Sequence, residues 1–306
     1  MNAKILVVGS NNSDMVIKAD RLPKAGETIL GGTFFMKPGG KGANQAVAAA
    51  RLGGKVTFVS KIGNDIFGRQ AVELFEEEGI DTSYIFSDPD HPSGVALITV
   101  DQHAENCIVV ASGANATLLP KDLGNLGAEI AAANFILMQL EIPIETVEFV
   151  TNQAQQSGTR VVLNPAPAQP LSDELLRKLH VITPNRVEAE MLTGLKVTDL
   201  ESAKQAAAMI REKGVKNVII TLGTEGALLH NEDGFVLIPA DEVVPVDTTG
   251  AGDVFNGALT VALCEEQPTA EAVLFACKAA GNSVTKLGAQ ASAPYRNELN
   301  ISKSGY

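Results

Sequence analysis

A short segment near the end of the chain joins two carboxylates to a glycine turn, Asp247-Thr-Thr-Gly-Ala-Gly-Asp253. It lies between a predicted strand at 243–246 and a predicted helix that begins at 253. The first N–H groups of a helix lack intrahelical acceptors and lie at the positive end of its dipole, so this turn can bind an anion. Gly250 and Gly252 let the backbone approach a phosphate closely. Asp253 could then accept a proton from an attacking hydroxyl; the alternative is that it only complements the helix dipole.

A second motif occupies residues 37–51 and reads Lys-Pro-Gly-Gly-Lys-Gly-Ala-Asn-Gln-Ala-Val-Ala-Ala-Ala-Arg. It is not a P-loop, because the glycine spacing differs and Gly42 follows Lys41 where Ser or Thr would be needed. The glycine pair instead opens a helix. Lys41 and Asn44 share one face of its first turn, where they could hydrogen-bond a polyol. The small alanines that follow favour close helix packing.

Polar residues also follow several predicted strands. Asn12 and Asp14 come after the first strand, two apart in an extended segment, so their side chains should point the same way. Three further segments, 138–141, 183–188 and 221–226, end strands in the same manner. Open α/β sheets bind ligands at the carboxyl ends of their strands, so a shared ligand site explains this placement better than separate solvated loops.

The elements that must hold these residues alternate apolar runs with segments of helical period, which is typical of a mostly parallel sheet covered by helices on both faces. We expect a doubly wound α/β fold in a single domain spanning 1–306. The predicted strands are 5–8, 56–60, 135–138, 161–163, 181–183, 218–221 and 243–246. The predicted helices are 42–52, 68–78, 144–156, 173–178, 187–193, 200–213, 253–264 and 270–287.

Two stretches, about 13–38 and 93–111, interrupt this alternation with extended segments and turns but no helix. The expected strands are 15–19, 28–36, 94–100 and 106–110. Strands joined without crossover helices fit poorly into a parallel sheet, so we predict a small antiparallel β lid.

The composition narrows the function classes. A net charge of -12 provides no basic field for nucleic acid. Three separated cysteines fit reduced thiols better than disulfides or a zinc site. The N-terminal segment lacks the features of a signal peptide, and no stretch reaches transmembrane length, so we expect a cytoplasmic protein without membrane partners.

The motifs Gly39-Gly-Lys-Gly-Ala-Asn-Gln45 and 247–253 resemble those of the ribokinase/phosphofructokinase-B class of carbohydrate kinases, and the resemblance extends over nearly the whole chain. The first motif, together with Asn12-Ser-Asp14, points to the ribokinase group. This resemblance implies ATP-dependent phosphorylation of D-ribose at O5, with Mg²⁺ and an activating K⁺, and a homodimer formed through the lid.

The resemblance also implies roles for individual residues. Asp253 would be the catalytic base, with the turn of Gly250, Ala251 and Gly252 as the anion hole. The sugar contacts would be Asn12, Asp14, Gly40, Lys41, Asn44, Glu141 and Asp253. The nucleotide site would comprise Asn185, Glu188, Thr221, Gly223, Thr224, Gly226, Ala251, Gly252 and Cys277. The monovalent-cation site would comprise Asp247, Thr249, Ser283, Lys286, Gly288 and Ser292, several through backbone carbonyls.

Two residues depart from the family pattern. Arg186 stands where relatives often have Glu, which changes the charge near the nucleotide. Cys277 stands near the expected adenine position, where histidine is usual.

The alternatives are another sugar or nucleoside kinase of this family, acting on deoxyribose, a fructose-type sugar or adenosine, and a non-catalytic sugar sensor. A sensor is disfavoured because Asp253 and the glycine turn are both present. A dehydrogenase is excluded, because no GxGxxG follows the first strand.

Overall fold

A computed structural model describes residues 3–103 and 105–299 and contains two sheets. The larger has nine strands in the order β13-β12-β11-β10-β9-β8-β1-β4-β5. In this order, the strands from β11 through β1 to β5 all run parallel, whereas β12 and β13 pair antiparallel at one end. Its strands are β1 (Lys4–Val8), β4 (Lys55–Gly63), β5 (Asp81–Asp88), β8 (Phe135–Met138), β9 (Arg160–Leu163), β10 (Val181–Ile182), β11 (Asn217–Thr221), β12 (Ala227–Asn231) and β13 (Gly234–Ile238).

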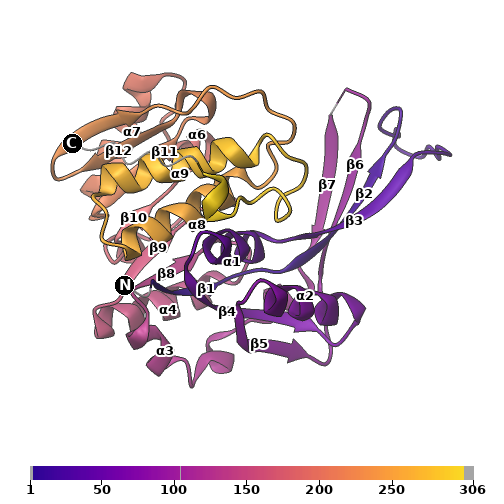
Figure 1. Cartoon of the computed structure of the whole chain (residues 1–306), viewed down its shortest axis with the longest axis horizontal. Helices are drawn as coiled ribbons and strands as arrows, with labels where there is room; N and C mark the ends of the chain where they lie inside the picture. The colour runs from indigo at the N-terminus through magenta and orange to yellow at the C-terminus, as the bar shows by residue number, and fades with distance from the viewer. Residues whose placement is uncertain (1–2, 104, 300–306) are drawn as a thin grey trace.

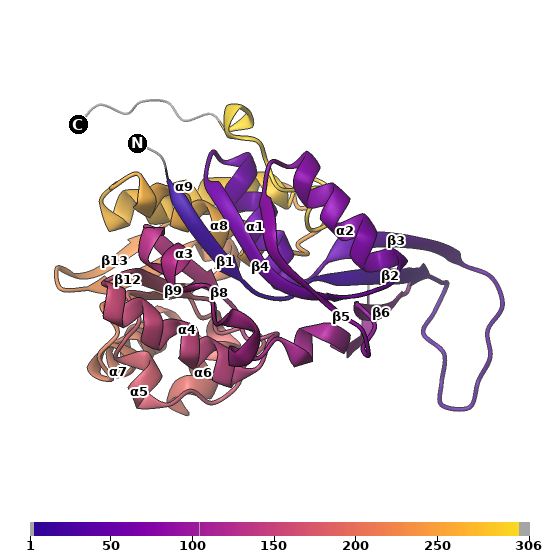
Figure 2. The same cartoon turned by 90° about the horizontal axis from the view of Figure 1, so that it is seen from below.

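Helices cover both faces of this sheet (Figure 2). One face carries α1 (Lys41–Arg51), α2 (Ile66–Glu77), α8 (Ala251–Cys264) and α9 (Thr269–Ser283). The other carries α3 (Gly127–Ala132), α4 (Ile144–Ser157), α5 (Asp173–Leu176), α6 (Arg186–Thr193) and α7 (Leu200–Glu212). Alternate β1 side chains enter opposite cores: Ile5 and Val7 enter one, and Leu6 and Val8 the other. Because both faces are buried, the central strands are apolar throughout, and the predicted doubly wound fold is confirmed.

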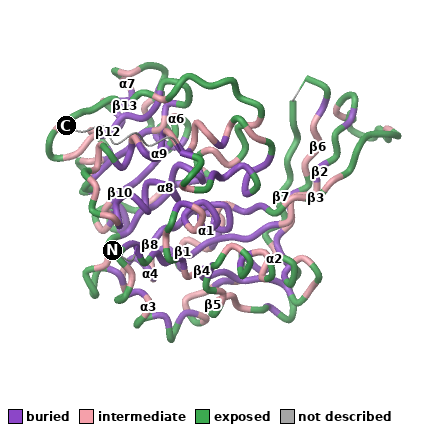
Figure 3. The backbone as a smooth tube through the Cα atoms, in the orientation of Figure 1, coloured by how far each residue is buried: buried purple, intermediate pink, exposed green. Residues whose placement is uncertain are grey.

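The lid projects from the α/β body (Figure 1), and many of its residues are exposed (Figure 3). It is a four-stranded sheet of β3 (Thr33–Gly39), β2 (Asn12–Lys18), β6 (Gly94–Val100) and β7 (Asn106–Ala111), in that order. The outer pairs are antiparallel, whereas β2 and β6 run parallel. That pairing is possible because β3, α1, β4, α2 and β5 intervene between the two strands and together make a long crossover.

Some predicted boundaries were wrong. Residues 243–246 do not form a strand: Pro245 lacks an N–H donor, and Val244 is 84% exposed. Residues 28–32 are also irregular, and the last predicted helix ends at Ser283 instead of 287. β5, β12 and β13 were missed; β5 and β13 are the two edges of the sheet, whereas β12 lies inside it with Ala227, Leu228 and Leu229 buried.

Candidate active site

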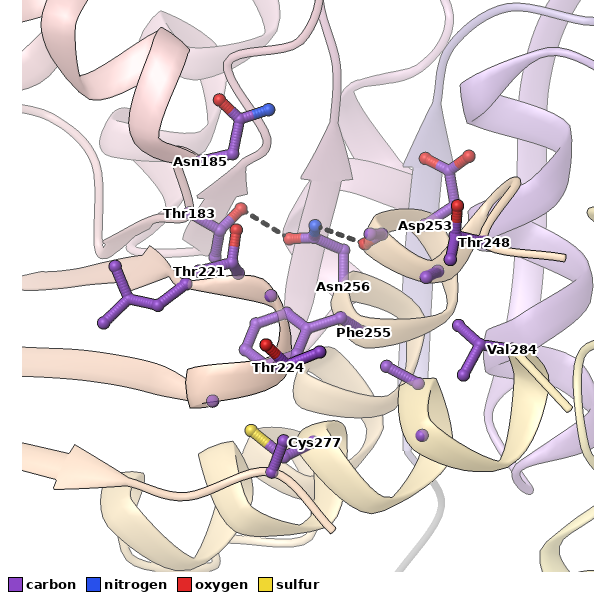
Figure 4. A pocket seen from close by; sticks show the side chains of 18 of the residues that line it. Thr183, Asn185, Thr221, Thr224, Thr248, Asp253, Phe255, Asn256, Cys277 and Val284 are labelled. Carbon is purple, nitrogen blue, oxygen red and sulfur yellow. Dashed lines mark hydrogen bonds between the residues drawn. The ribbon is translucent and has the colours of Figure 1, made fainter. Parts of the chain in front are cut away.

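A pocket of about 820 Å³ lies at the carboxyl ends of β9, β10 and β11, between α6 and the starts of α1 and α8 (Figure 4). The order of the sheet reverses between β1 and β8, next to β9, because the chain runs from β1 outward to β4 on one side and later to β8 on the other. Ligands of open α/β folds bind at such a point. The predicted site residues that line it are Lys41, Asn185, Glu188, Thr221, Gly223, Thr224, Gly226, Gly250, Ala251, Gly252, Asp253 and Cys277.

Asp253 lies in the first turn of α8 and is only 6% exposed. Its Oδ2 accepts a hydrogen bond from Asn44 Nδ2, and its Oδ1 accepts one from Gln45 Nε2, both at 2.9 Å. Burial raises the pKa of Asp253, while Lys41 and the two amides act in the opposite direction. The result is a desolvated carboxylate held in a fixed orientation, as a general base requires.

Lys41 and Glu141 lie beside this carboxylate. The backbone N–H of Lys41 and the hydroxyl of Ser10 donate to Glu141 Oε2 at 2.9 and 2.6 Å, and Lys41 Nζ is 3.8 Å from Glu141 Oε1. Burial alone would lower the pKa of Lys41, but Asp253 and Glu141 raise it above its ordinary value. The Lys41 ammonium therefore stays charged between Glu141 and the carboxylate that follows the Gly250–Gly252 turn.

Asp14 and Asn12 project from the same face of β2, as predicted. Burial and the nearby carboxylate of Glu141 raise the pKa of Asp14 to about 6. Asn12 is buried, and its Oδ1 accepts a hydrogen bond from Asn115 Nδ2 at 2.8 Å. This leaves the Asn12 amide group to serve as a donor. Gly40, the N-cap of α1, has φ 89°, and a Cβ there would lie 2.7 Å from the backbone nitrogen of Asn12. Only glycine therefore fits this junction.

The contact between the two motifs depends on small residues where α1 meets α8. A Cβ added to Gly257 would lie 2.8 Å from Ala48 Cβ and 2.9 Å from the Gln45 carbonyl oxygen. At the start of α8, Gly250 has φ 76°, and a Cβ there would lie 2.8 Å from Ala289 Cβ. The alanine-rich helix therefore packs tightly, as its composition predicts.

Asn185 and Glu188 begin α6 at the edge of the pocket. They form a reciprocal capping box, in which Asn185 Oδ1 accepts from the Glu188 N–H at 2.9 Å and Glu188 Oε2 accepts from the Asn185 N–H at 2.8 Å. Burial raises the pKa of Glu188. A desolvated carboxylate on the pocket wall suits Mg²⁺, which binds proteins through one or two carboxylates together with substrate phosphates. Within residues 3–103 and 105–299, no cluster of three or more His, Cys, Asp or Glu side chains could hold a metal ion alone.

The predicted cation-site residues come together only in part. Asp247 Oδ1 accepts from the backbone N–H and hydroxyl of Thr249 at 3.0 and 2.6 Å, and Oδ2 accepts from the Gly288 N–H at 2.9 Å. These hydrogen bonds outweigh burial and lower the pKa of Asp247. A charged carboxylate provides oxygen ligands, which fit a hard cation.

The remaining members of that set have other partners. The hydroxyls of Ser283 and Ser292 donate to carbonyl oxygens of Ala280 and Ala289, and the ammonium of Lys286 pairs with Glu298 at 3.0 Å. Lys286 could therefore contribute only through its backbone carbonyl, whereas the hydroxyl oxygens of Ser283 and Ser292 keep lone pairs for a cation.

Both departures from the family pattern lie at the pocket. Arg186 Nη2 donates to Glu225 Oε1 at 2.6 Å, which ties α6 to the short helical turn Gly223–Glu225. Cys277 is buried on α9, and burial raises the pKa of its thiol to about 12. The thiol is therefore neutral.

Sequence reasoning assigned no role to four buried residues, Ser10, Gln45, Asn115 and Gln139. The first three are hydrogen-bonded to predicted site residues, and Gln139 is hydrogen-bonded to Gln45. Ser10, Gln45 and Gln139 stand within or beside motifs already singled out, so their position was a usable signal. Asn115 lies in a short 3-10 helix outside every motif, and nothing in its local sequence marks it.

The family model for pfkB family carbohydrate kinases matches residues 2–296. The chain is 47% identical over 298 residues to a ribokinase of Haemophilus influenzae, covering 97% of each chain. It is 38% identical to a deoxyribokinase of Salmonella typhi, again covering 97% of each. A structure of Arabidopsis thaliana ribokinase complexed with ribose and ATP is similar with a TM-score of 0.93 and 33% identity, covering 99% of this chain and 100% of that one.

The chain therefore belongs to the pfkB family of carbohydrate kinases. Its fold is ribokinase-like, and the expected enzyme class, a phosphotransferase of the ribokinase type with an alcohol acceptor, is confirmed. None of the helices among the described residues is both long and apolar enough to span a membrane.

Proposed function

We propose that this kinase transfers the γ-phosphoryl group of ATP to O5 of D-ribose, with Asp253 as the catalytic base. The observation that carries this proposal is the 2.9 Å hydrogen bond between Asn44 and Asp253, which joins the polyol motif of α1 to the phosphate turn of α8. The pocket beside the turn has room for a nucleotide, and Lys41, which lines it, donates its backbone N–H to Glu141, one of the proposed sugar contacts.

In the proposed reaction, Asp253 accepts the O5 proton as O5 bonds to the γ-phosphorus and the bond from that phosphorus to the β,γ-bridging oxygen breaks. ADP and ribose 5-phosphate are released. The N–H groups of the Gly250–Gly252 turn and the ammonium of Lys41 stabilise the charge on the transferring group. Magnesium, held by the phosphates near Glu188, would neutralise charge on the nucleotide. The lid would close over the sugar and exclude water, which limits ATP hydrolysis.

We also propose that the chain acts as one unit and pairs through its lid. Register places Asp14 on the face of the lid toward the site and opposes Met15 to Leu97 and Leu97 to Val109 on the other face. That outer face carries the apolar side chains Met15, Ile17, Phe34, Met36, Leu97 and Val109, and all of these except Met15 are exposed in the single chain. An apolar sheet face of this kind is typical of a homodimer interface.

The decisive variant is Asp253→Asn. It keeps the shape and both neighbours of the carboxylate but cannot accept a proton, so kcat should fall about 10²- to 10⁴-fold while ribose still binds. We would measure ADP release and, separately, ribose binding by calorimetry. Turnover near that of the parent enzyme would remove Asp253 from the role of base.

The second candidate substrate is deoxyribose, favoured by the full-length similarity to a deoxyribokinase. A coupled ADP-release assay with ribose, deoxyribose, fructose and adenosine separates the candidates by kcat/KM, and we expect ribose to be highest. The same assay in potassium and in sodium tests the proposed cation site, for which potassium should give the higher activity.

A further inference from the structure

A chain of buried amides leads from the central sheet to the carboxylate of Asp253. Gln139 directly follows β8, and its Nε2 donates to Gln45 Oε1 at 2.6 Å. Gln45 Nε2 in turn donates to Asp253 Oδ1 at 2.9 Å. Both glutamines are fully buried (0% exposed), so water cannot replace either hydrogen bond.

The direction of these hydrogen bonds determines what Gln45 can do. A glutamine side chain can present either its NH₂ group or its carbonyl oxygen to a neighbour. Because Gln139 donates to the Gln45 oxygen, the Gln45 NH₂ group must face Asp253. The opposite orientation would place a carbonyl oxygen against a carboxylate oxygen, and the two would repel each other.

Gln139 contributes little to stability by this arrangement. Its Oε1 is buried and has no hydrogen-bond partner among the described residues, and a buried unsatisfied acceptor is destabilising. Gly9 leaves the space for this oxygen, because a Cβ at position 9 would lie 2.0 Å from Gln139 Oε1. An apolar side chain of similar size would remove this unpaired acceptor but leave Gln45 Oε1 unpaired instead, so stability alone gives little reason for a glutamine at position 139, and we infer a functional role.

We propose that Gln139 and Gln45 are positioning residues for the phosphoryl transfer, an inference that rests on the proposed role of Asp253 as base. Gln139 selects the orientation of Gln45, and Gln45 holds Asp253 Oδ1 in place and favours its ionised form. Neither glutamine needs to contact the sugar. Their loss should therefore lower kcat, leave the KM for ribose nearly unchanged, and move the acidic limb of the kcat–pH profile to higher pH, since a carboxylate that loses a donor is protonated more readily.

The test compares Gln45→Met, Gln139→Met and the double variant with Asn217→Leu. The control removes a buried amide hydrogen bond, Asn217 Nδ2 to the His180 carbonyl at 3.0 Å, at the opposite end of the sheet. We expect kcat to fall about 10- to 100-fold in Gln45→Met and less in Gln139→Met. The melting temperature of Gln139→Met should change little, because one unpaired buried acceptor replaces another. The double variant should match Gln45→Met, because Gln139 acts through Gln45. Asn217→Leu should keep the parent kcat and pH profile.

The outcomes separate this inference from the proposed function. If both glutamine variants keep the parent kcat and the parent acidic pH limb while Asp253→Asn is inactive, the positioning role of the glutamines is wrong. The proposed role of Asp253 as base would still stand. A kcat loss in Gln139→Met that only follows a lower melting temperature, or that adds fully to that of Gln45→Met, would also overturn it. An active Asp253→Asn would remove both proposals together.

Discussion

Asn44 and Asp253 are 209 residues apart in sequence, yet a 2.9 Å hydrogen bond joins their side chains. The bond exists because α1 and α8 approach closely, with Gly257 packed against Ala48. The chemistry at the pocket therefore depends on a helix contact one turn away from it.

Gly257→Ala tests this dependence. The new methyl group would overlap Ala48 and the backbone at Gln45, and relief of such overpacking costs about 1–3 kcal/mol or separates the helices. We expect kcat to fall and the melting temperature to drop. Gly127→Ala is the matched control, because nothing lies within 4 Å of a Cβ at that glycine in α3. Steady-state kinetics and thermal melts check both, and equal behaviour of the two variants would contradict the idea.

We predict that the ionised Asp14 carboxylate binds the sugar but destabilises the folded protein. Its pKa is raised in the folded protein from 3.8 to about 6 by burial, then by Glu141. The folded state therefore binds a proton at Asp14 more tightly than the unfolded chain does. The stabilisation from this proton is complete below pH 3.8 and is lost as the pH rises through 6. Asp14→Asn should raise the melting temperature more above pH 6 than near pH 4.

Ribose binding, in contrast to folding, should favour the ionised form of Asp14. Sugar hydroxyls donate to the ionised carboxylate, so affinity should fall as the pH drops below 6, and Asp14→Asn should weaken ribose binding about 10- to 100-fold and remove most of this pH dependence. Calorimetry across pH measures both effects. Asp20→Asn, at an exposed position of the lid, is the control. A parent-like pH response in Asp14→Asn would assign the titration to another group.

The sequence predicted the central strands and marked the two glycine motifs, because both leave local signals. Central strands such as β1 and β8 are apolar throughout, and the two glycine motifs have distinctive spacing. The amide chain left no such signal. Gln139 reaches Gln45 across 94 residues and Gln45 reaches Asp253 across 208, and both contacts depend on which strands are neighbours and how α1 crosses α8. The 243–246 segment misled for a related reason: its valines look like a strand, but Val243 and Pro245 line the pocket.

Disruption of the outer lid face should separate the proposed homodimer. Leu97→Lys places a charge on the apolar face, where burial against a partner would be costly, so sedimentation should report a monomer. Leu237→Lys on β13 is the control, because Leu237 is a comparably exposed leucine on a strand of the other sheet, 44% against 56%. A dimer that survives Leu97→Lys would place the interface elsewhere.

Arg186 lines the pocket in which we propose that the nucleotide binds, and it pairs with Glu225, so two explanations of its role make opposite predictions. If its charge attracts the ATP phosphates, Arg186→Gln should raise the KM for ATP about 3- to 10-fold at low salt, as expected for a partly exposed charge. Glu225→Gln should then lower that KM, because it removes a competing anion. If Arg186 only anchors the 223–225 turn, both variants should raise the KM, since both break the same ion pair. We expect opposite signs, with the ribose KM unchanged and the effect reduced in high salt. Arg69→Gln, at an exposed position of α2, controls for loss of one positive charge.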